Sequence, residues 1–307
     1  MGGGILAGLL AGALWGWVFI APRMTAGLSS VDLAAGRFVV FGAMSLLVLA
    51  LMPGQRRWPT WPQVGWALAL SVLGFSGYYW LLVLAIRDAG TEVPTLIIGT
   101  IPLWIMLLGK PHGLRWAALI PGLLLTAAGL ALMVQATPAP TPTLAADAAA
   151  SAAHTTPHFL RGIGYAVTGM VSWTAFSLLN ATWLRRHPEV SLSDWSNWLG
   201  VATGSGALLL WLALGTPAQA LWAQPGFMQS VWVCLVSGLG SAWLATWLWN
   251  VASQRLSASL CGQLIVSETL FALLYSFLLD GHWPSWPQLA ACVLFTLGIL
   301  FSIKAHR

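Results

Sequence analysis

The chain has 307 residues, of which 58% are hydrophobic and only 7% are charged. A soluble domain carries roughly a quarter charged residues, so this composition excludes an ordinary soluble protein and predicts that the lipid bilayer is its surrounding partner. The formal net charge of +5 comes from basic residues scattered through short loops. Because they form no basic stripe, we expect no nucleic-acid partner.

Long apolar stretches recur along the chain with short breaks between them. A helix of about 20 residues crosses a hydrocarbon core roughly 30 Å thick, and most of the stretches approach this length. Hydropathy therefore predicts an all-α polytopic membrane protein with ten transmembrane helices. We place them near residues 5–22, 31–52, 63–86, 93–109, 114–134, 159–183, 192–214, 227–252, 257–279 and 287–304.

The longest break runs from about Gln135 to Pro157 and is rich in Ala, Thr and Pro. It is almost uncharged and too poor in large apolar residues to bury a core, so it is typical of a flexible linker. We expect a first five-helix repeat over 1–134, a periplasmic linker over 135–158 and a second five-helix repeat over 159–307.

Basic residues predict the orientation, because Lys and Arg near span ends are retained in the cytoplasm. If the N-terminus is cytoplasmic, nine of them lie inside: Arg56, Arg57, Lys110, Arg115, Arg185, Arg186, Arg255, Lys304 and Arg307. Only Arg23, Arg87 and Arg161 then lie outside. This bias supports ten spans with both termini cytoplasmic.

Five spans per half place the second half on the opposite side from the first, which predicts two inverted repeats. Weak self-similarity agrees with this arrangement. Gly4-Ile5 and Trp15 match Gly162-Ile163 and Trp173 at one constant offset, and Leu73-Gly74 recurs as Leu239-Gly240.

One acidic residue, Glu268, lies deep in a predicted span, where a charged group is costly. Gln263 and Ser267 are its polar neighbours on the same helix. Glu268 is a candidate for proton coupling or for pairing with a substrate ammonium, and a purely structural carboxyl is the alternative. Arg37 lies closer to a span end, and we expect it to snorkel toward the headgroups.

The chain contains 20 tryptophans. Those near span ends suit the headgroup level and predict membrane anchors: Trp58, Trp61, Trp116, Trp183, Trp195, Trp198, Trp222, Trp283 and Trp286. Within one span, aromatic and amide side chains follow helical spacing, namely Trp243, Trp247, Asn250 and Gln254. An aromatic face beside amides favours an amphipathic organic solute or a cation.

Small residues and prolines predict two further features of the helices. Gly4, Gly8, Gly12 and Gly16 form one smooth face, which indicates close helix packing or a seam on which one bundle rocks. Pro94 and Pro102 predict that the fourth span is interrupted.

A GxSG string, Gly74-Phe75-Ser76-Gly77, matches intramembrane serine proteases. A serine nucleophile needs a nearby base, yet every histidine falls in a predicted loop or tail. The cysteines are too dispersed for a metal site, and no nucleotide-binding loop occurs, so we expect no enzyme, no metal and no cofactor.

The whole chain resembles the EamA branch of the drug/metabolite transporter superfamily. The ninth and tenth spans carry most of the resemblance, in Ser267-Glu268-Thr269, Asp280-Gly281 and Leu297-Gly298. Most EamA proteins have Glu-Pro where this chain has Glu268-Thr269. This departure and Gly77-Tyr78-Tyr79-Trp80 are more similar to the YddG-type aromatic amino acid exporters.

This resemblance implies a multi-pass protein of a bacterial-type inner membrane, with spans 1, 3, 4, 6, 8 and 9 around a central cavity. It implies export of Trp, Phe and Tyr. Apart from the resemblance, we hypothesise alternating access between the two halves, with a monomer as the expected unit. Protons are a candidate second partner, and proton-coupled and downhill transport both stay open. The implied substrate-binding residues are Tyr78, Thr95, Trp173, Trp243, Gln263 and Ser267, with Glu268 as a coupling or structural candidate.

Three alternatives remain open at this point. The first is efflux of cationic drugs such as methyl viologen or of other small metabolites, with Glu268 as the counter-charge. The second is a membrane-embedded enzyme that depends on Ser76. The third is a structural membrane scaffold, which predicts no solute flux.

Overall fold

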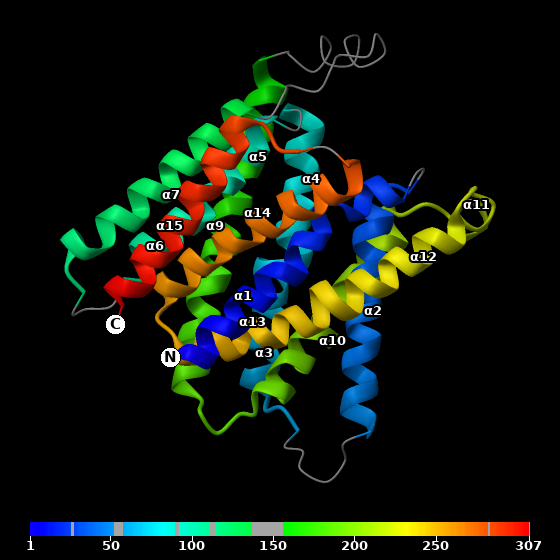
Figure 1. The fold of residues 1–307 in the computed structure, drawn as a ribbon. Coiled ribbons are helices and arrows are strands. Elements are labelled where there is room, and N and C mark those ends of the chain that lie inside the picture. Colours follow the sequence, from blue (N-terminus) through cyan, green and yellow to red (C-terminus); the bar gives the residue numbers. More distant parts are fainter. Residues whose placement is uncertain are drawn as a thin grey trace.

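The computed structural model describes residues 1–25, 28–51, 58–89, 92–110, 114–136, 156–281 and 283–306. These residues form helices without strands (Figure 1). The elements are α1 (Gly2–Gly16), η1 (Trp17–Phe19), η2 (Ala21–Met24), α2 (Ser30–Leu51), α3 (Trp61–Ser71), η3 (Val72–Ser76), α4 (Gly77–Ala89), α5 (Glu92–Gly99), α6 (Ile101–Leu108), α7 (Trp116–Ala136), α9 (Thr156–Arg186), α10 (Leu192–Leu214), α11 (Ala218–Trp222), α12 (Phe227–Val236), η4 (Ser237–Leu244), α13 (Ala245–Arg255), α14 (Ala258–Asp280) and α15 (Trp286–Ala305).

Seven helical stretches of the described chain are long and apolar enough to cross a membrane. They are Val31–Leu51, Trp61–Ala85, Pro157–Arg186, Leu192–Leu214, Phe227–Arg255, Ala258–Leu279 and Trp286–Ala305. Three shorter apolar helices, Gly2–Gly16, Ile97–Leu108 and Trp116–Leu132, coincide with the remaining predicted spans. The prediction of an all-α polytopic membrane protein is confirmed, whereas the predicted linker lies largely outside the described residues.

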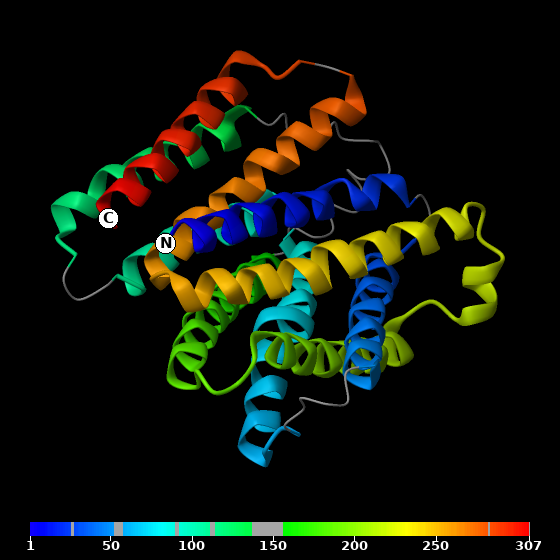
Figure 2. The same cartoon turned by 60° about the horizontal axis from the view of Figure 1, so that its bottom comes forward.

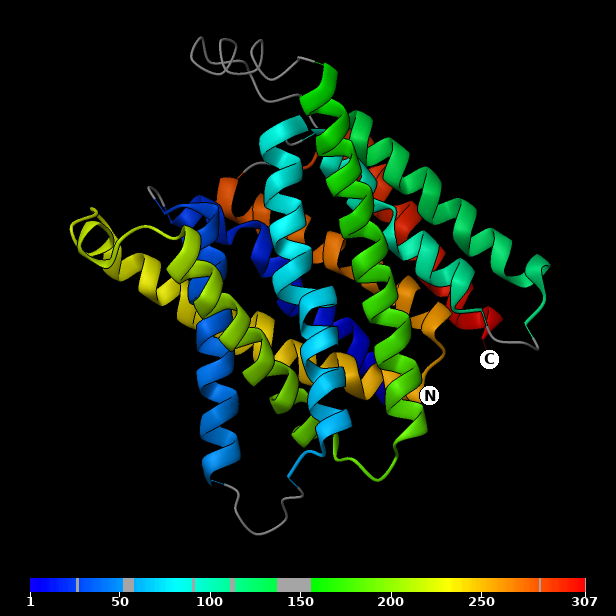
Figure 3. The same ribbon diagram turned by 180° about the vertical axis from the view of Figure 1, so that it is seen from behind.

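Two glycines bring α2 and α10 into backbone contact (Figure 3). A Cβ atom added at Gly42 would lie 2.8 Å from the Cα of Gly204, and one added at Gly204 would lie 2.7 Å from the Cα of Gly42. Farther along, Phe41 and Ser45 crowd Gly200. Because residue numbers rise on α2 as they fall on α10, the two helices are antiparallel.

A second antiparallel pair, α7 and α15, repeats this reciprocal glycine contact on the other side of the molecule (Figure 2). A Cβ atom at Gly122 would lie 3.3 Å from the carbonyl oxygen of Gly298, and the converse distance is also 3.3 Å. Thr126 and Ser302 both hydrogen-bond the buried amide of Gln263 on α14. This amide therefore ties α14 to the pair.

The glycine ladder of α1 packs along α14, as the spacing predicts. Added Cβ atoms at Gly8, Gly12 and Gly16 would each lie within 3 Å of a residue of α14. α1 also packs against α13, and Gly4, at the start of the ladder, contacts Arg255 and Leu256 where α13 ends. α1 is therefore sandwiched between two helices of the second half.

Two spans change locally from α-helix to π-helix. These segments are η3, between α3 and α4, and η4, between α12 and α13. A π segment misaligns backbone hydrogen bonds and is often found at functional sites. Leu73 and Gly74 lie in η3, and Leu239 and Gly240 lie in η4, so the repeated dipeptide of the sequence falls in both segments.

The fourth span is interrupted beside Pro102, as predicted, whereas Pro94 lies within α5. α5 ends at Gly99 and α6 begins at Ile101, next to Pro102. The hydroxyl of Thr100 donates a hydrogen bond to the carbonyl of Ile97 at 2.6 Å and thereby satisfies a backbone group at the break.

Three tryptophans predicted as headgroup anchors are instead buried in a core. Trp183, Trp195 and Trp198 are 3%, 0% and 8% exposed. Trp183 and Trp195 stack with ring centroids 3.5 Å apart. The interpretation was wrong because the turn between α9 and α10 folds these span ends onto each other. The other six are exposed, as an anchor requires: Trp58, Trp61, Trp116, Trp222, Trp283 and Trp286.

Candidate functional site

Three tryptophans from three helices meet inside the bundle. Trp15 of α1 lies 5.3 Å from Trp249 of α13 and 6.3 Å from Trp173 of α9, measured between ring centroids. Trp173 and Trp249 are 6.4 Å apart, so every pair is within the range of favourable aromatic contact. Trp249 is 1% exposed, and its Nε1 has no hydrogen-bond partner among the described residues. We name this group the tryptophan triad.

The aromatic surface continues from the triad toward α2. Phe176 lies 6.0 Å from Trp173 and 5.3 Å from Phe75 of η3. Phe75 in turn contacts Phe38, which packs edge-on against Tyr79 at 6.5 Å. One unbroken row of rings therefore joins helices that are far apart in the sequence.

The face predicted from Trp243 to Gln254 is divided in the structure. Trp243 donates from its Nε1 to Asn197 at 2.9 Å, whereas Trp247 is 38% exposed. Trp243 belongs to η4, whose wider turn shifts the register ahead of α13. Trp249, outside the predicted face, points into the interior instead.

Asn250 takes part in a buried hydrogen-bond chain. It accepts from Asn180 at 2.7 Å and donates to Ser196 at 2.8 Å, while Asn180 accepts from Trp195 at 2.8 Å. Because both the oxygen and the nitrogen of the Asn250 amide are hydrogen-bonded, this side chain joins α13 to α9 and α10. This is a structural network beside the tryptophan triad.

Charged and phenolic groups gather near the α2 end of this aromatic surface. Glu268 is half-buried and interacts electrostatically with Arg37 and Tyr78. Arg37 does not snorkel: its guanidinium lies 4.7 Å from the ring of Phe38, and its Nε is buried without a partner among the described residues. A single membrane region therefore contains one acid, one guanidinium and the phenols of Tyr78 and Tyr79.

Two predicted site residues are engaged with neighbouring helices. Ser267 is 2% exposed and donates to the carbonyl of Leu264 at 2.6 Å, and it packs against Gly12. Gln263 is fully buried in its contacts with Thr126 and Ser302. The structure brings Glu268 near Tyr78 and Trp173 near Trp249, while the side chain of Thr95 lies outside the described part.

Ser76 has no arrangement for nucleophilic catalysis in the described chain. Its hydroxyl lies 3.5 Å from the carbonyl of Ser71 in its own helix. Among the described histidines, His158 hydrogen-bonds Arg161, and His187 and His306 bond to backbone carbonyls near their own helix ends. His112, His154 and His282 lie outside the described residues.

Two small cavities lie beside η1 and η4, where the Nε1 of Trp17 donates to Ser237 at 3.2 Å. One, of about 160 Å³, lies between α1, η4 and α14 and includes Tyr275. The other, of about 100 Å³, includes Arg37, Tyr79 and Ser237. Both are smaller than the roughly 300–1,000 Å³ typical of small-molecule sites.

Comparison with known proteins identifies the family of this helical arrangement. The sequence matches the profile of the EamA-like transporter family over residues 2–135 and again over residues 160–304. The chain belongs to the EamA-like transporter family. Inner membrane protein YtfF of Escherichia coli (strain K12) is 30% identical to this EamA-like chain over 321 residues, which cover 98% of the chain and 95% of that relative.

A solved crystal structure of another protein has the same fold as this EamA-like chain. The TM-score is 0.76 at 23% identity, and the match covers 99% of this chain and 97% of the other. The EamA-like chain is therefore a membrane transporter for a small molecule and a multi-pass protein of the inner membrane.

Sequence reasoning missed part of this EamA-like transporter's interior. Trp15 and Trp249 were not named as candidates, although the match of Trp15 to Trp173 in the repeats was a signal for the first. The ion pair of Asp88 with Arg161 gave no signal, because the two residues are 73 positions apart.

Proposed function

We propose that the chain exports aromatic amino acids (Trp, Phe and Tyr) or similar amphipathic metabolites from the cytoplasm by alternating access. The observation that carries this proposal is the tryptophan triad, to which α1 contributes Trp15 and the second half contributes Trp173 and Trp249. A site between two moving halves can be exposed to either side in turn.

The proposed topology has ten spans, formed by the seven long and three shorter apolar helices. Both described chain ends lie at the lower left of Figure 1, whereas α9 begins at the top. Together with the excess of Lys and Arg at loops 2, 4, 6 and 8, this supports cytoplasmic termini. The family profile matches the chain twice, which supports repeats over 1–134 and 159–307 joined by a linker over 135–158.

Helix contacts support an inverted, two-fold-related pair of halves. A two-fold axis exchanges spans 1 and 6, 2 and 7, 3 and 8, 4 and 9, and 5 and 10. Under this exchange the pair α4 with α9 becomes α13 with α1, and both pairs are in contact. The pairs α2 with α10 and α7 with α15 map onto themselves, which agrees with their reciprocal glycine contacts.

For the substrate, the site supplies rings and separate polar groups. Aromatic faces pack favourably against an aromatic side chain. The Nε1 of Trp249 is a donor without a partner among the described residues, and Glu268 and Arg37 carry opposite charges for an amino acid's two ends. We propose Tyr78, Thr95, Trp173, Trp243, Gln263 and Ser267 as substrate contacts and Glu268 as the coupling residue, with protons as a partner and a monomer as the working unit.

The test is uptake of radiolabelled tryptophan, phenylalanine and lysine into proteoliposomes. We expect saturable flux of the two aromatic amino acids and none of lysine. Trp173→Ala and Trp249→Ala should each reduce tryptophan flux at least about tenfold, because each removes a buried ring contact. The matched control is Trp232→Ala, since Trp232 is 63% exposed. Equal flux in all three variants would refute a role of the triad.

A specific observation also favours a second candidate, efflux of cationic drugs. Glu268 is half-buried and makes no direct ion pair with a described residue. A cation stacked on tryptophan faces would supply a counter-charge. In that case methyl viologen should be transported, and Glu268→Gln should abolish its flux while leaving that of tryptophan measurable.

A further inference from the structure

α4 is an arm with distinct structures at its two ends. At its start, the π segment η3 connects it to α3, and at its tip Asp88 is followed by Ala89, the last residue of the helix. Along its length it packs antiparallel against α9, as Figure 3 shows. Since α4 belongs to the first half and α9 to the second, this contact crosses between the halves.

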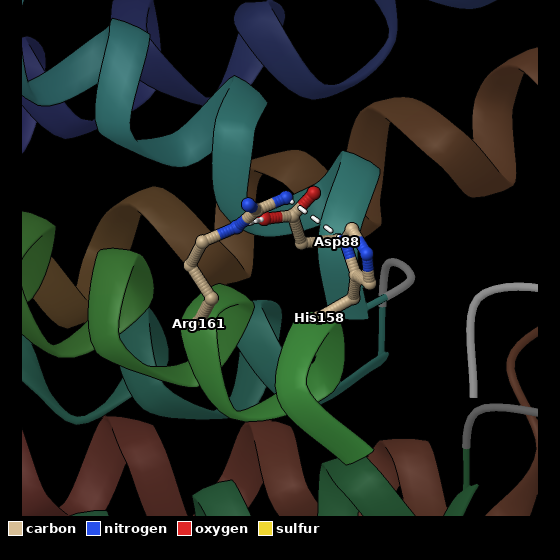
Figure 4. Close-up of polar contacts among 3 residues, drawn as sticks. All are labelled: Asp88, His158 and Arg161. Atoms are coloured by element: carbon tan, nitrogen blue, oxygen red, sulfur yellow. Dashed lines mark hydrogen bonds and ion pairs between the residues drawn. The ribbon is translucent and has the colours of Figure 1, made fainter. Parts of the chain in front are cut away.

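An ion pair closes the tip of this contact (Figure 4). Arg161 of α9 donates from Nε to the Oδ2 of Asp88 at 2.6 Å, and its Nη2 lies 2.9 Å from His158 Nδ1. The Asp88 side chain is 9% exposed and that of Arg161 is 51% exposed. Removing the guanidinium would therefore leave the buried Asp88 carboxyl, packed against Gly162, without the charge of Arg161.

The base of the arm combines a π segment with a glycine. The π segment leaves the carbonyl of Leu73 available, and it accepts a hydrogen bond from Ser172 of α9 at 2.7 Å. Gly74 packs directly on the ring of Phe176. Kinks in helices concentrate at π segments and glycines. The base is therefore tied to α9 by a hydrogen bond. The rest of α4 continues from the base along α9 as far as Asp88.

The corresponding contact at the opposite face has no ion pair. There the end of α13 meets the start of α1, and a Cβ atom at Gly4 would lie 3.1 Å from the Cβ of Arg255, just as one at Gly162 would lie 3.0 Å from the Cβ of Asp88. Among the described residues, however, no ion pair joins α13 to α1. The charge latch is thus confined to one of two equivalent seams.

We propose that α4 is a gate arm that bends at η3, and that Asp88 and Arg161 latch it against α9 at the face opposite the chain termini. When the pair breaks, the seam between α4 and α9 opens toward Tyr78. The inference rests on the proposed alternating access but not on the identity of the substrate. Asp88 and Arg161 act as positioning residues, because they hold the arm and do not touch the aromatic site.

The experiment measures opening without any substrate. A cysteine at Gly169 is the reporter, because the glycine is buried in this seam and an added Cβ would have ordinary contacts of 3.7 Å with Tyr78, Leu81 and Ile98. It is introduced after replacing Cys234, Cys261 and Cys292 by alanine. Its labelling rate with a membrane-impermeant maleimide is then measured in nanodiscs.

We expect Asp88→Asn and Arg161→Gln each to raise the labelling rate of the reporter about tenfold, and the double variant to raise it no further, because the two act as one pair. Arg161→Lys should stay near the parent rate, since it keeps the charge. Asp194→Asn, at the other end of the molecule, is the matched control. Parent-like labelling in both single variants, or additive effects in the double, would overturn the latch.

Two further readouts keep folding and function separate. The thermal midpoint of each variant identifies protein that has unfolded, and Arg161→Gln should stay folded because its side chain is half exposed. Tryptophan flux is measured in the same preparations. If the latch variants raise the labelling rate but no variant or parent transports tryptophan, the gate is supported and the proposed substrate is refuted. If tryptophan is transported but the variants label like the parent, the substrate is supported and the gate is refuted.

Discussion

Thr216 holds both oxygens of Asp32 at the point where α10 returns toward α2. Its backbone N–H donates to Oδ1 at 2.9 Å and its hydroxyl donates to Oδ2 at 2.6 Å. Trp211 adds a third bond at 3.1 Å, and Asp32 is only 5% exposed. A buried carboxylate is tolerated when donors satisfy it.

Replacing this carboxylate should weaken the whole fold. Asp32→Ala removes an acceptor shared by Ser29, Thr216 and Trp211 and should lower the free energy of unfolding by about 2–3 kcal/mol. Thermal unfolding of purified protein, followed by tryptophan fluorescence, measures the loss. Asp194→Ala is the control and should change stability by less than about 1 kcal/mol. Equal midpoints for the two variants would contradict the prediction.

The glycine contact between α2 and α10 should tolerate no side chain. Gly42→Ala places a methyl group 2.8 Å from the Cα of Gly204, so backbone must move, at a cost of about 1–3 kcal/mol. Gly65→Ala is the matched control, because nothing lies within 4 Å of its added Cβ. The comparison is made by thermal unfolding, and a Gly42→Ala protein as stable as Gly65→Ala would argue against the described contact.

Gln263 can be tested for a role beyond joining helices. Thr126→Val removes one partner of the amide and should reduce stability by roughly 1–3 kcal/mol without changing the KM for tryptophan. Gln263→Ala should cause a similar loss of stability and also raise the KM. Flux in proteoliposomes gives the KM of each variant. If neither variant changes KM, Gln263 only joins α14 to α7 and α15.

Ser76 should be dispensable for transport. Its hydroxyl lies 3.5 Å from a carbonyl of its own helix and has no base near it among the described residues. Ser76→Ala should therefore retain tryptophan flux within about twofold, since a peripheral hydroxyl contributes little. Covalent turnover that disappears in this variant would instead favour the membrane enzyme.

The apolar periodicity predicted the membrane class and the positions of the helices well, because a bilayer requires long apolar segments with internally satisfied backbones. The break at Thr100 was foreseeable from Pro102, because proline lacks a backbone N–H and interrupts a helix locally. Side-chain directions were less predictable. Trp247 and Trp249 are two residues apart on α13, and Trp249 is the buried one. The π segment ahead of α13 breaks the α-helical spacing on which the prediction relied.

Tertiary contacts were the least accessible to sequence reasoning. Trp183 and Trp195 looked like interface anchors because position in a span does not reveal what packs against it. Arg161 was counted only as a basic residue that sets the orientation, and no sequence pattern indicated that it pairs with Asp88. Such pairs depend on the tertiary arrangement alone.

The reciprocal glycine contacts have a consequence for how such a chain could originate. A residue on a two-fold axis meets its own counterpart. If the ancestor was a five-helix protein that inserted in both orientations and paired with itself, a single glycine codon supplied the glycine on both sides of each contact. After duplication and fusion, each contact needs a glycine at two separate codons. Gly42 and Gly204 then descend from one ancestral glycine, and Gly122 and Gly298 from another, and both members of each pair must now be kept.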